Sequence, residues 1–389
     1  MKKICMLTDN ITSVGGIQRC VCMLSNELIK NNMEVTILCI NKFNDGNVPF
    51  NLSSKVKVEY VKKVSVLNKI LFWWTKIITK LDIKKGILKN LKKIQTAVSF
   101  KSKYSRNNDL LKKINDGKYD YVIVNGGSLV LLVGIYADKI NSKLIGWQHS
   151  SCASYFEDKK DNLKYYKRLY KDCLNKLNNY VVLTNNDKKW FLDNMNYKCE
   201  TIYHMKPFTT TKTANINNKV FISVGRLVDD KNYELLIEAF NIFAAKEPDW
   251  RLVIYGEGPK YQELNDLILK YKLENRVFIK KFKNDISEAY LDSSIFITSS
   301  KIEGFGLVLI EAMECGLPII ATNIPAFNEL VKKDNGIIIK KNTAQSLAEE
   351  MYKLCLNKKE IKKYSENNKK EALNFSKESV THKWLNLMK

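Results

Sequence analysis

The chain has 389 residues, of which 45% are hydrophobic and 27% are charged, and its formal net charge at pH 7 is +23. A chain of this length exceeds what one hydrophobic core usually serves, so we expect two domains. Its nine cysteines are scattered, without a CxxC pair, which argues against a disulfide framework and against a zinc site. The positive charge favours polyanionic partners: nucleic acid, anionic lipid or phosphorylated substrates.

The first ten residues, MKKICMLTDN, contain too short an apolar run for a signal peptide and are interpreted as a buried strand. The longest apolar runs, at 70–74 and 129–137, stop well short of the roughly 18 residues that a membrane-spanning helix requires. We therefore expect a protein of the reducing cytosol that does not span a membrane.

Between residues 62 and 106, a dozen lysines and a single acid, Asp82, are interleaved with apolar residues at helical spacing. Trp73 and Trp74 lie beside lysines, which suits a helix lying in the plane of an anionic bilayer. The alternative is a solvated helix that packs its apolar stripe on the core. The sequence favours contact with an anionic membrane surface here.

Strand and helix patterns alternate along the chain, which is typical of parallel sheets built from βαβ units. The strand-like runs of the first half are KKICMLT (2–8), EVTILCI (34–40), YDYVIVN (119–125), KLIGWQH (143–149) and NNYVVLT (178–184). After a polar stretch at 209–219, the strand-like runs are VFISVG (220–225), WRLVIYG (250–256), RVFIKKF (276–282), SIFITSS (294–300) and LPIIATN (317–323). We therefore predict an α/β fold of two Rossmann-like doubly wound domains, 1–206 and 207–372, facing each other across a cleft that holds ligands at the carboxyl ends of the strands.

Gly15 and Gly16, in SVGGIQR, follow the first predicted strand and open a helix. They permit close approach of a phosphate or a sugar to the helix N-terminus, and a plain turn is the alternative interpretation. The dinucleotide fingerprint G-x-G-x-x-G is not present there, which counts against a nicotinamide dehydrogenase.

The segment VGRLVDDKN (224–232) places Arg226 and Lys231 in a loop that leads from a strand to a helix. Two cations at a strand's carboxyl end can bind a diphosphate without a metal. Alternatively, Asp229 and Asp230 neutralise both cations in a surface turn.

Glu303 and Glu311 lie in SSKIEGFGLVLIEAMECGLPIIATN (299–323). Glycines beside Phe305 allow a sharp turn, so we expect a helix to start near Leu307, with both carboxylates facing the same cleft. Carboxylates accept hydrogen bonds from pairs of hydroxyls, and free N–H groups at the helix start bind hydroxyls or phosphate. A purely structural alternative for Glu311 is that it complements the helix dipole.

Residues 303–322 resemble the signature of retaining GT-B glycosyltransferases that use nucleotide sugars, in glycosyltransferase family 4 or glycosyl transferases group 1 of the bacterial polysaccharide type. The hallmark of that family is two glutamates with seven residues between them. The similarity extends, in the family's order, to GGIQR (15–19), HS (149–150), VGRLVDDKN (224–232) and IYGEGP (254–259).

The resemblance implies a role for each matching residue. Glu303 hydrogen-bonds the donor sugar near the reacting centre, and Glu311 holds the ribose 2′ and 3′ hydroxyls. Arg226 and Lys231 stabilise the departing diphosphate, which is electrostatic catalysis aimed at the transition state. His149 lies beside the donor sugar, although a lone histidine is more often structural.

Four further residues are implied to contact substrate through the backbone. Gly16 lets the N-terminal loop approach donor and acceptor, and the chain around Phe305, Gly306 and Leu307 contacts sugar hydroxyls or phosphate. Contacts to the base are expected near Lys281 and Phe282, where the sequence lacks the family's usual glycine.

The resemblance also implies the reaction and its partners. The sugar, a hexose or N-acetylhexosamine, moves with retention from a nucleotide sugar, which we expect to be a UDP-sugar. No cofactor is implied, and the absence of a D-x-D motif argues against a metal. The expected acceptor is a lipid-linked or membrane-surface glycan of a capsule, exopolysaccharide or lipopolysaccharide, with the enzyme peripheral on the inner face of the cell membrane. Residues 373–389 are expected to form a helix that crosses back onto the first domain.

Two alternatives remain open at this point. One is a GT-B hydrolase or epimerase of nucleotide sugars, which would retain the same four charged residues. The other is a basic nucleic-acid-binding protein, which would show steep salt dependence, although no nucleic-acid motif is present and we expect no nucleic acid as a partner.

Overall fold

The computed structural model describes residues 1–41, 48–61, 107–157, 162–281, 283 and 285–389. The basic stretch at 62–106 lies outside the described residues, so its contact with a membrane stays a prediction. Contacts between residues divide the chain into a first unit, Met1–Ile202 with Thr381–Lys389, and a second unit, Tyr203–Val380. The boundary therefore falls between residues 202 and 203, where the sequence had placed it between 206 and 207.

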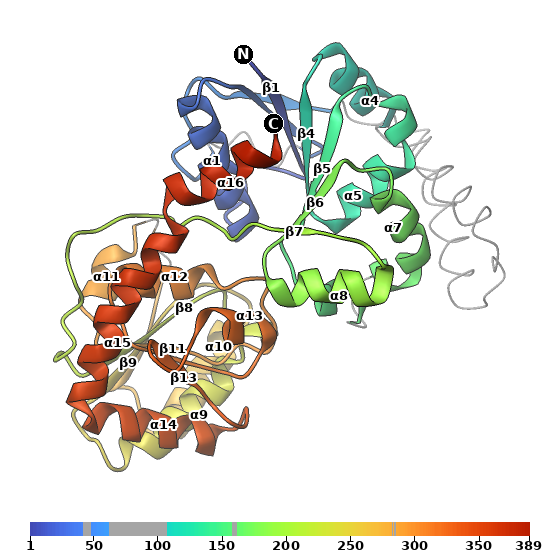
Figure 1. Ribbon diagram of the computed structural model, residues 1–389. Helices are drawn as coiled ribbons and strands as arrows, with labels where there is room; N and C mark the ends of the chain where they lie inside the picture. Colours follow the sequence, from blue (N-terminus) through green and yellow to red (C-terminus); the bar gives the residue numbers. More distant parts are fainter. Residues whose placement is uncertain (42–47, 62–106, 158–161, 282, 284) are drawn as a thin grey trace. The chain divides into compact units, whose positions relative to one another are not determined.

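A seven-stranded parallel sheet forms the centre of the first unit (Figure 1). Its strands are β1 (Lys3–Thr8), β2 (Glu34–Cys39), β3 (Lys57–Tyr60), β4 (Tyr121–Asn125), β5 (Lys143–Trp147), β6 (Asn179–Val182) and β7 (Glu200–Thr201). The spatial order is β3-β2-β1-β4-β5-β6-β7, so the order reverses between β1 and β4, which is the topological switch point of a doubly wound sheet. The sequence did not predict β3 and β7, because both are short and neither is a continuous apolar run.

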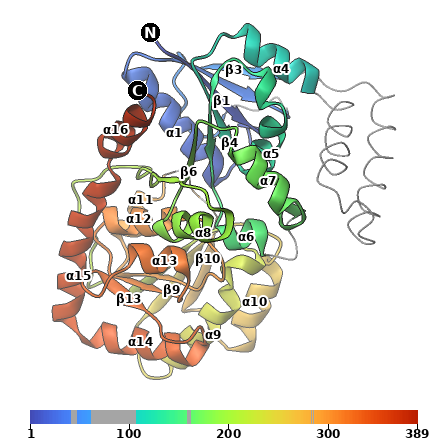
Figure 2. The same cartoon turned by 45° about the vertical axis from the view of Figure 1, so that its right-hand side comes forward.

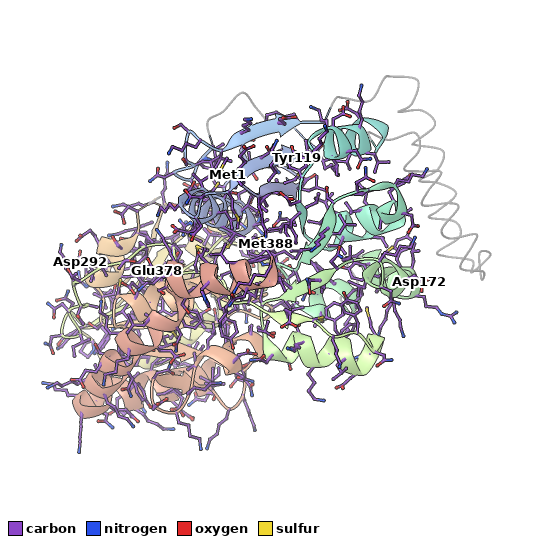
Figure 3. The ribbon with its side chains drawn as sticks, turned by 45° about the horizontal axis from the view of Figure 1, so that its top comes forward. Met1, Tyr119, Asp172, Asp292, Glu378 and Met388 are labelled. Carbon is purple, nitrogen blue, oxygen red and sulfur yellow. The ribbon has the colours of Figure 1, made fainter. Side chains whose placement is uncertain are left out.

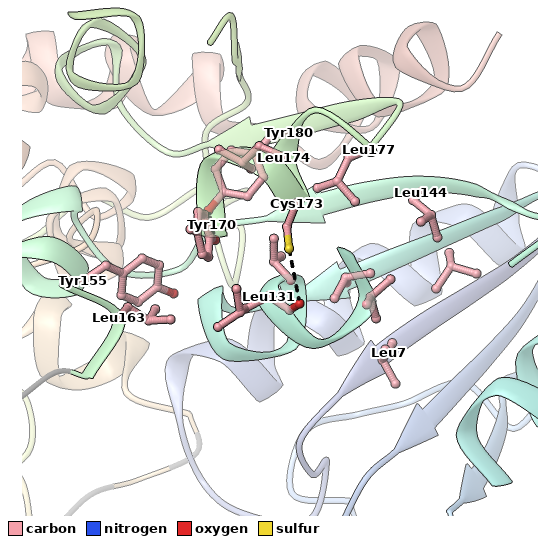
Figure 4. Packing of buried hydrophobic residues seen from close by; sticks show 14 of the residues in the cluster. Leu7, Leu131, Leu144, Tyr155, Leu163, Tyr170, Cys173, Leu174, Leu177 and Tyr180 are labelled. Carbon is pink, nitrogen blue, oxygen red and sulfur yellow. Dashed lines mark hydrogen bonds between the residues drawn. The ribbon is translucent and has the colours of Figure 1, made fainter. Parts of the chain in front are cut away.

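Helices cover both faces of this sheet. They are α1 (Gly16–Lys30), α4 (Asn107–Asp116), α5 (Gly127–Ile135), α6 (Cys152–Phe156), α7 (Lys167–Leu174) and α8 (Asn185–Met195), with 3₁₀ turns η1 (Ala137–Lys139) and η2 (Asn162–Tyr166). Alternate strand residues such as Leu7 and Val124 share one core with α5 and α7, as side chains on one face of a strand must. Figure 4 shows part of this core, in which the Cys173 thiol donates to the carbonyl of Leu131 at 3.7 Å.

The last residues of the chain pack on the same unit. Helix α16 (Lys377–Leu387) carries Trp384, which is fully buried with its ring 4.9 Å from that of Trp147 in β5. The Tyr121 hydroxyl donates to the carbonyl of Met388 at 2.8 Å, and Met388 is labelled in Figure 3. These contacts tie the C-terminal segment to strands β4 and β5.

The second unit contains a six-stranded parallel sheet in the order β10-β9-β8-β11-β12-β13. Its strands are β8 (Val220–Val224), β9 (Arg251–Tyr255), β10 (Val277–Lys280), β11 (Ile295–Thr298), β12 (Ile319–Ala321) and β13 (Gly336–Ile338). The switch point of this sheet lies between β8 and β11. The two sheets confirm the predicted α/β architecture of two Rossmann-like units, and the cleft expected between the units stays a prediction.

The helices of the second unit are α9 (Tyr233–Ala244), α10 (Tyr261–Lys270), α11 (Ser287–Leu291), α12 (Leu307–Glu314), α13 (Pro325–Leu330), α14 (Ala344–Leu356) and α15 (Lys358–Glu371), with 3₁₀ turns η3 (Asp229–Lys231) and η4 (Ala372–Phe375). Helix α14 packs beside α9 (Figure 2), and both share a core with α10, α15 and the strands. Among the described residues, no helix is long and apolar enough to cross a membrane.

Candidate active site

In the second unit, the predicted site residues follow the two strands that flank the switch point. Arg226 and Lys231 come after β8, and Glu303 comes after β11. These strands are direct neighbours in the sheet, with Ile295 paired to Phe221. Because the strands are parallel, both loops leave the same edge of the sheet, the edge at which doubly wound sheets bind ligands.

The structure joins two of these residues in an ion pair. The ammonium group of Lys231 contacts a carboxylate oxygen of Glu303, and the two side chains are only 20% and 15% exposed. Charges that are partly shielded from water attract each other more strongly than charges on an open surface. Residues that lie 72 positions apart in the sequence therefore form one charged centre.

Two buried serines hold this ion pair in place. The hydroxyl of Ser299 donates to the backbone carbonyl of Lys231 at 2.9 Å, and the hydroxyl of Ser300 donates to the carboxylate of Glu303 at 3.1 Å. Thr322 in turn donates to the carbonyl of Ser300 at 2.7 Å. Sequence reasoning assigned no role to the serines, although their position directly after a buried strand was a usable signal.

Gly225 leaves room for the Lys231 side chain. A Cβ atom at Gly225 would lie 3.3 Å from Lys231 Cε and 3.0 Å from the hydroxyl of Tyr233. Burial raises the pKa of the Tyr233 hydroxyl, and the nearby charge of Glu303 adds to the effect. Tyr233 therefore stays protonated and neutral beneath the ion pair.

The aspartates of this loop do not neutralise Lys231, as the alternative interpretation required. Asp229 pairs with Lys260 at 2.9 Å, and the hydrogen bonds that the Lys260 ammonium group donates to Glu234 and to Asp229 raise the pKa of Lys260. Arg226 is exposed at the end of β8. The surface-turn interpretation is therefore wrong for Lys231, whose carboxylate partner is Glu303.

The glycine-rich turn places the start of α12 where the sequence predicted it. Gly306 has φ +101° and caps the helix that begins at Leu307, and this left-handed conformation favours glycine. The first N–H groups of any helix lack an acceptor within the helix. They supply donors at the same edge of the sheet as Glu303.

The side chain of Phe305, within this turn, is buried against two other aromatic rings. Phe305 is 3% exposed and lies 5.5 Å from the rings of both Tyr203 and His204. The Tyr203 hydroxyl donates to Glu329 at 2.8 Å. Burial lowers the pKa of His204 to about 3, so this histidine is neutral in the folded protein. Any substrate contact at Phe305 must therefore come from its backbone.

Glu311 projects from α12 into a buried site, with 3% of its surface exposed. One of its carboxylate oxygens accepts a hydrogen bond from the fully buried Tyr290 of α11 at 2.7 Å. A buried carboxylate needs such donors, so Tyr290 orients Glu311. The first turn of α12 contains no acid, and the dipole effect fades beyond the first turn, so the dipole interpretation of Glu311 is wrong.

In the first unit, His149 lies just beyond β5 and contacts the end of β4. Its Nε2 atom is 3.0 Å from Asn125 Oδ1, and the amide nitrogen of Asn125 donates to the carbonyl of Leu7 at 2.9 Å. The Trp147 ring lies 4.5 Å from the imidazole. His149 is thus fixed at the carboxyl edge of the first sheet, and sequence reasoning did not identify Asn125.

Gly16 is exposed and is the first residue of α1. Gly15 caps that helix in an extended conformation, with φ −176°, which any residue can adopt. The backbone conformation therefore does not require glycine at position 15, and both interpretations of the two glycines stay open.

Glu257 lies in IYGEGP (254–259), another segment that resembles the family. The backbone carbonyl of Glu257 accepts from the amide of Leu227 at 2.9 Å, which ties two loops together. Phe282 lies outside the described residues, so base contacts there stay a prediction. Within the described part of the chain, no group of three or more His, Cys, Asp or Glu residues could hold a metal ion.

Comparisons with known proteins agree with this geometry. Residues 209–371 match the family described as glycosyl transferases group 1. Over the full length of both chains, the sequence is 27% identical to an uncharacterized glycosyltransferase of Haemophilus influenzae. It is 24% identical, again over both full lengths, to the amylovoran biosynthesis glycosyltransferase AmsD of Erwinia amylovora.

The structure is similar to the crystal structure of an S. aureus TarM mutant in complex with fondaparinux, alpha-GlcNAc-glycerol and UDP. The TM-score is 0.76, both chains are covered completely, and the sequences are 16% identical. At this identity, the similarity establishes the fold of the whole chain, while its chemistry rests on the side chains described above.

Proposed function

We infer that this chain is a GT-B glycosyltransferase of the bacterial polysaccharide type, because its second unit contains the region matching glycosyl transferases group 1, and on that premise we propose its reaction. It transfers a hexose or N-acetylhexosamine, with retention of anomeric configuration, from a nucleoside diphosphate sugar to a glycan acceptor. We propose UDP as the nucleotide, and the TarM mutant structure, which is a complex with UDP, supports that choice.

The ion pair between Lys231 and Glu303 carries this proposal. When the donor binds, the diphosphate competes with Glu303 for the ammonium group, and Arg226 adds a second cation. Negative charge then gathers on the leaving diphosphate as the glycosidic bond breaks, and fixed cations stabilise that charge most in the transition state. Glu303 remains as an acceptor for a sugar hydroxyl, and the step uses neither a cofactor nor a metal.

Glu311 holds the ribose in this proposal. A carboxylate has two acceptor oxygens and can take two neighbouring hydroxyls, and Tyr290 fixes the orientation of the group. Donors at the start of α12, from Gly306 and Leu307, bind sugar hydroxyls or phosphate. His149 and Gly16 of the first unit are assigned to the donor sugar and to the approach of the acceptor.

The proposed acceptor is a lipid-linked or membrane-surface glycan, which the chain reaches as a peripheral protein on the inner face of the cell membrane. The support is the relationship to a protein of amylovoran biosynthesis and the basic aromatic stretch at 62–106.

The first experiment is thermal stabilisation of the full chain by UDP, GDP, ADP and CMP. We expect stabilisation by UDP that is lost in Glu311→Ala. Glu360→Ala is the matched control, because Glu360 also accepts a hydrogen bond from a tyrosine, Tyr364, at 2.8 Å in the same unit. If no nucleotide stabilises the wild type, or if both variants lose stabilisation equally, the proposed site is wrong.

Product analysis distinguishes a transferase from a hydrolase and from an epimerase. With a UDP-sugar and a synthetic polyprenyl diphosphate sugar as acceptor, the proposal predicts a glycoside whose NMR coupling shows the anomeric configuration of the donor. Free sugar alone would identify a hydrolase, and an altered UDP-sugar would identify an epimerase. Binding of generic duplex DNA that falls steeply with salt would instead favour the nucleic-acid alternative.

A further inference from the structure

Lys260 lies in the turn after β9, directly before α10. Strand β9 is the neighbour of β8 in the second sheet and runs parallel to it, so this turn leaves the same edge as the loop that carries Arg226 and Lys231. The backbones of the turn and the loop are bonded, because the amide of Lys260 donates to the carbonyl of Leu227 at 3.1 Å. A Cβ atom at Gly258 would lie 2.4 Å from the same carbonyl oxygen. The turn after β9 therefore packs directly against the cation-bearing loop.

The ammonium group of Lys260 contacts three carboxylates. It pairs with Glu234, and it lies 2.9 Å from a carboxylate oxygen of Asp229 and 3.1 Å from one of Glu263. The Lys260 side chain is only 20% exposed. Its hydrogen bonds, first of all the one to Glu234, raise the pKa of the ammonium group. Lys260 is therefore positively charged at neutral pH.

Two of these acids flank Lys231 in the chain. Asp229 and Lys231 are the first and last residues of η3, and Glu234 lies in the first turn of α9. Carboxylates so close along the chain are within reach of the Lys231 ammonium group. In the structure, however, both acids contact Lys260, and Lys231 contacts Glu303.

We propose that Lys260 is a positioning residue for the diphosphate, because it draws Asp229 and Glu234 toward itself and so leaves the cations of the loop to the substrate. The inference rests on the proposed function, in which Arg226 and Lys231 bind the diphosphate. Without the ammonium group of Lys260, the two acids would compete with the diphosphate for Lys231, since opposite charges at this distance attract each other.

Calorimetric titrations of the full chain with UDP and with UMP test this role. UMP lacks the second phosphate, so the ratio of the two dissociation constants reports on the cations that bind it. The wild type should prefer UDP. Lys260→Met should reduce this preference about tenfold, which lies within the range of coupling between residues of one charged network, and Lys260→Arg should preserve it because the charge remains. An unchanged preference in Lys260→Met overturns the proposal.

A second substitution in the same network tests the mechanism. Asp229→Asn should hardly change the preference by itself, but it should restore much of the preference in Lys260→Met, because it removes one competing acid. No recovery in the double variant would mean that Lys260 supports the shape of the loop and not its charge, which overturns the proposal. If Lys260→Met fails to fold, Lys260→Gln takes its place, since it removes the charge and keeps hydrogen-bond donors.

Lys219→Met is the matched control. Lys219 directly precedes β8, at the opposite edge of the same sheet, and pairs with Asp249 at 2.7 Å. It should keep the wild-type preference, and an equal reduction in Lys219→Met and Lys260→Met overturns the proposal in favour of an effect of overall charge.

The same titrations separate this inference from the proposed function. If the wild type binds neither nucleotide, or binds both alike, the proposed role of the loop cations fails and the inference fails with it. If the wild type prefers UDP and Lys260→Met keeps that preference, only the inference fails.

Discussion

The switch points of the two sheets have the same strand topology but opposite chemistry. In the first unit, β1 and β4 meet at Asn125, which presents an amide to His149. In the second unit, β8 and β11 lead to Lys231 and Glu303, which form an ion pair. Neutral hydrogen-bonding groups suit a sugar hydroxyl, and fixed charges suit a diphosphate. The topology therefore gives each sheet the same kind of edge, and the residues after its strands determine the chemistry of that edge.

The two centres also differ in how they are held. The side chain of Asn125 itself spans two strands, so one residue both joins the sheet and orients the imidazole. The ion pair instead depends on the hydroxyls of Ser299 and Ser300. A charged pair can be drawn apart by a charged substrate, whereas an amide bonded to the backbone of a strand stays fixed.

The largest effect should come from removing the cation of the charged centre. Lys231→Ala should lower kcat by roughly 100-fold to 1,000-fold, which is the size found when a preorganised transition-state contact is lost. Glu303 would then face the diphosphate without its partner. Steady-state kinetics with a UDP-sugar measure the change.

Lys219→Ala is the matched control for this variant. Lys219 precedes β8 at the opposite edge of the same sheet and pairs with Asp249 at 2.7 Å, so the substitution removes the same charge away from the site. Equal losses in both variants would mean that the overall charge of the unit, rather than the centre at Lys231, supports the reaction.

Removing Glu311, the proposed hydrogen-bond acceptor for the ribose hydroxyls, should have the next largest effect. Glu311→Ala should weaken UDP binding by roughly 10-fold to 100-fold, because hydrogen bonds to charged groups contribute about 1.5–3 kcal/mol. Calorimetry with UDP and 2′-deoxy-UDP measures it: the wild type should prefer UDP, and the variant should bind both alike. An unchanged preference in the variant would place the ribose elsewhere.

His204, in the second unit, shows how burial keeps an imidazole neutral. Burial lowers the pKa of His204 to about 3, from 6.5, so the unfolded chain binds more protons between these values. Stability is then fully present above about pH 6.5 and is lost as pH falls toward 3, by roughly 1.4 kcal/mol per pH unit. His204→Phe should flatten this part of the curve of unfolding free energy against pH.

His382→Gln is the control for that experiment, because His382 is exposed on α16. It should leave the slope unchanged. If His204→Phe and the wild type lose stability equally between pH 6.5 and 4, the burial of His204 does not govern the acid limb.

Local signals in the sequence were sufficient for much of this description. Continuous apolar runs predicted β1 and β8, and the glycines before Leu307 predicted the start of α12, because these features depend on neighbouring residues. The strands β3 and β7 lack that signal and exist because a partner strand is available. The family resemblance named Lys231 and Glu303 without indicating that they would be paired.

The residues that the sequence could not reveal are those that act through a neighbour. Asn125 and Tyr290 lie in ordinary strand and helix patterns, and only the fold brings them to His149 and Glu311. A buried tyrosine is usually a core residue, so its hydroxyl becomes informative only when its acceptor is known.

Tyr290→Phe is therefore the finest test of the proposed ribose site at Glu311, with the smallest expected effect. It removes one hydroxyl and keeps the ring, so Glu311 loses a donor and its orientation. We expect UDP binding to weaken by about threefold to fivefold, in line with about 1 kcal/mol for a hydrogen bond, and the preference for UDP over 2′-deoxy-UDP to shrink. Tyr364→Phe is the matched control, since its hydroxyl donates to Glu360 at 2.8 Å. It should change stability without changing that preference. If both variants keep the wild-type preference, Tyr290 supports only the core, and the orientation of Glu311 must come from α12 itself.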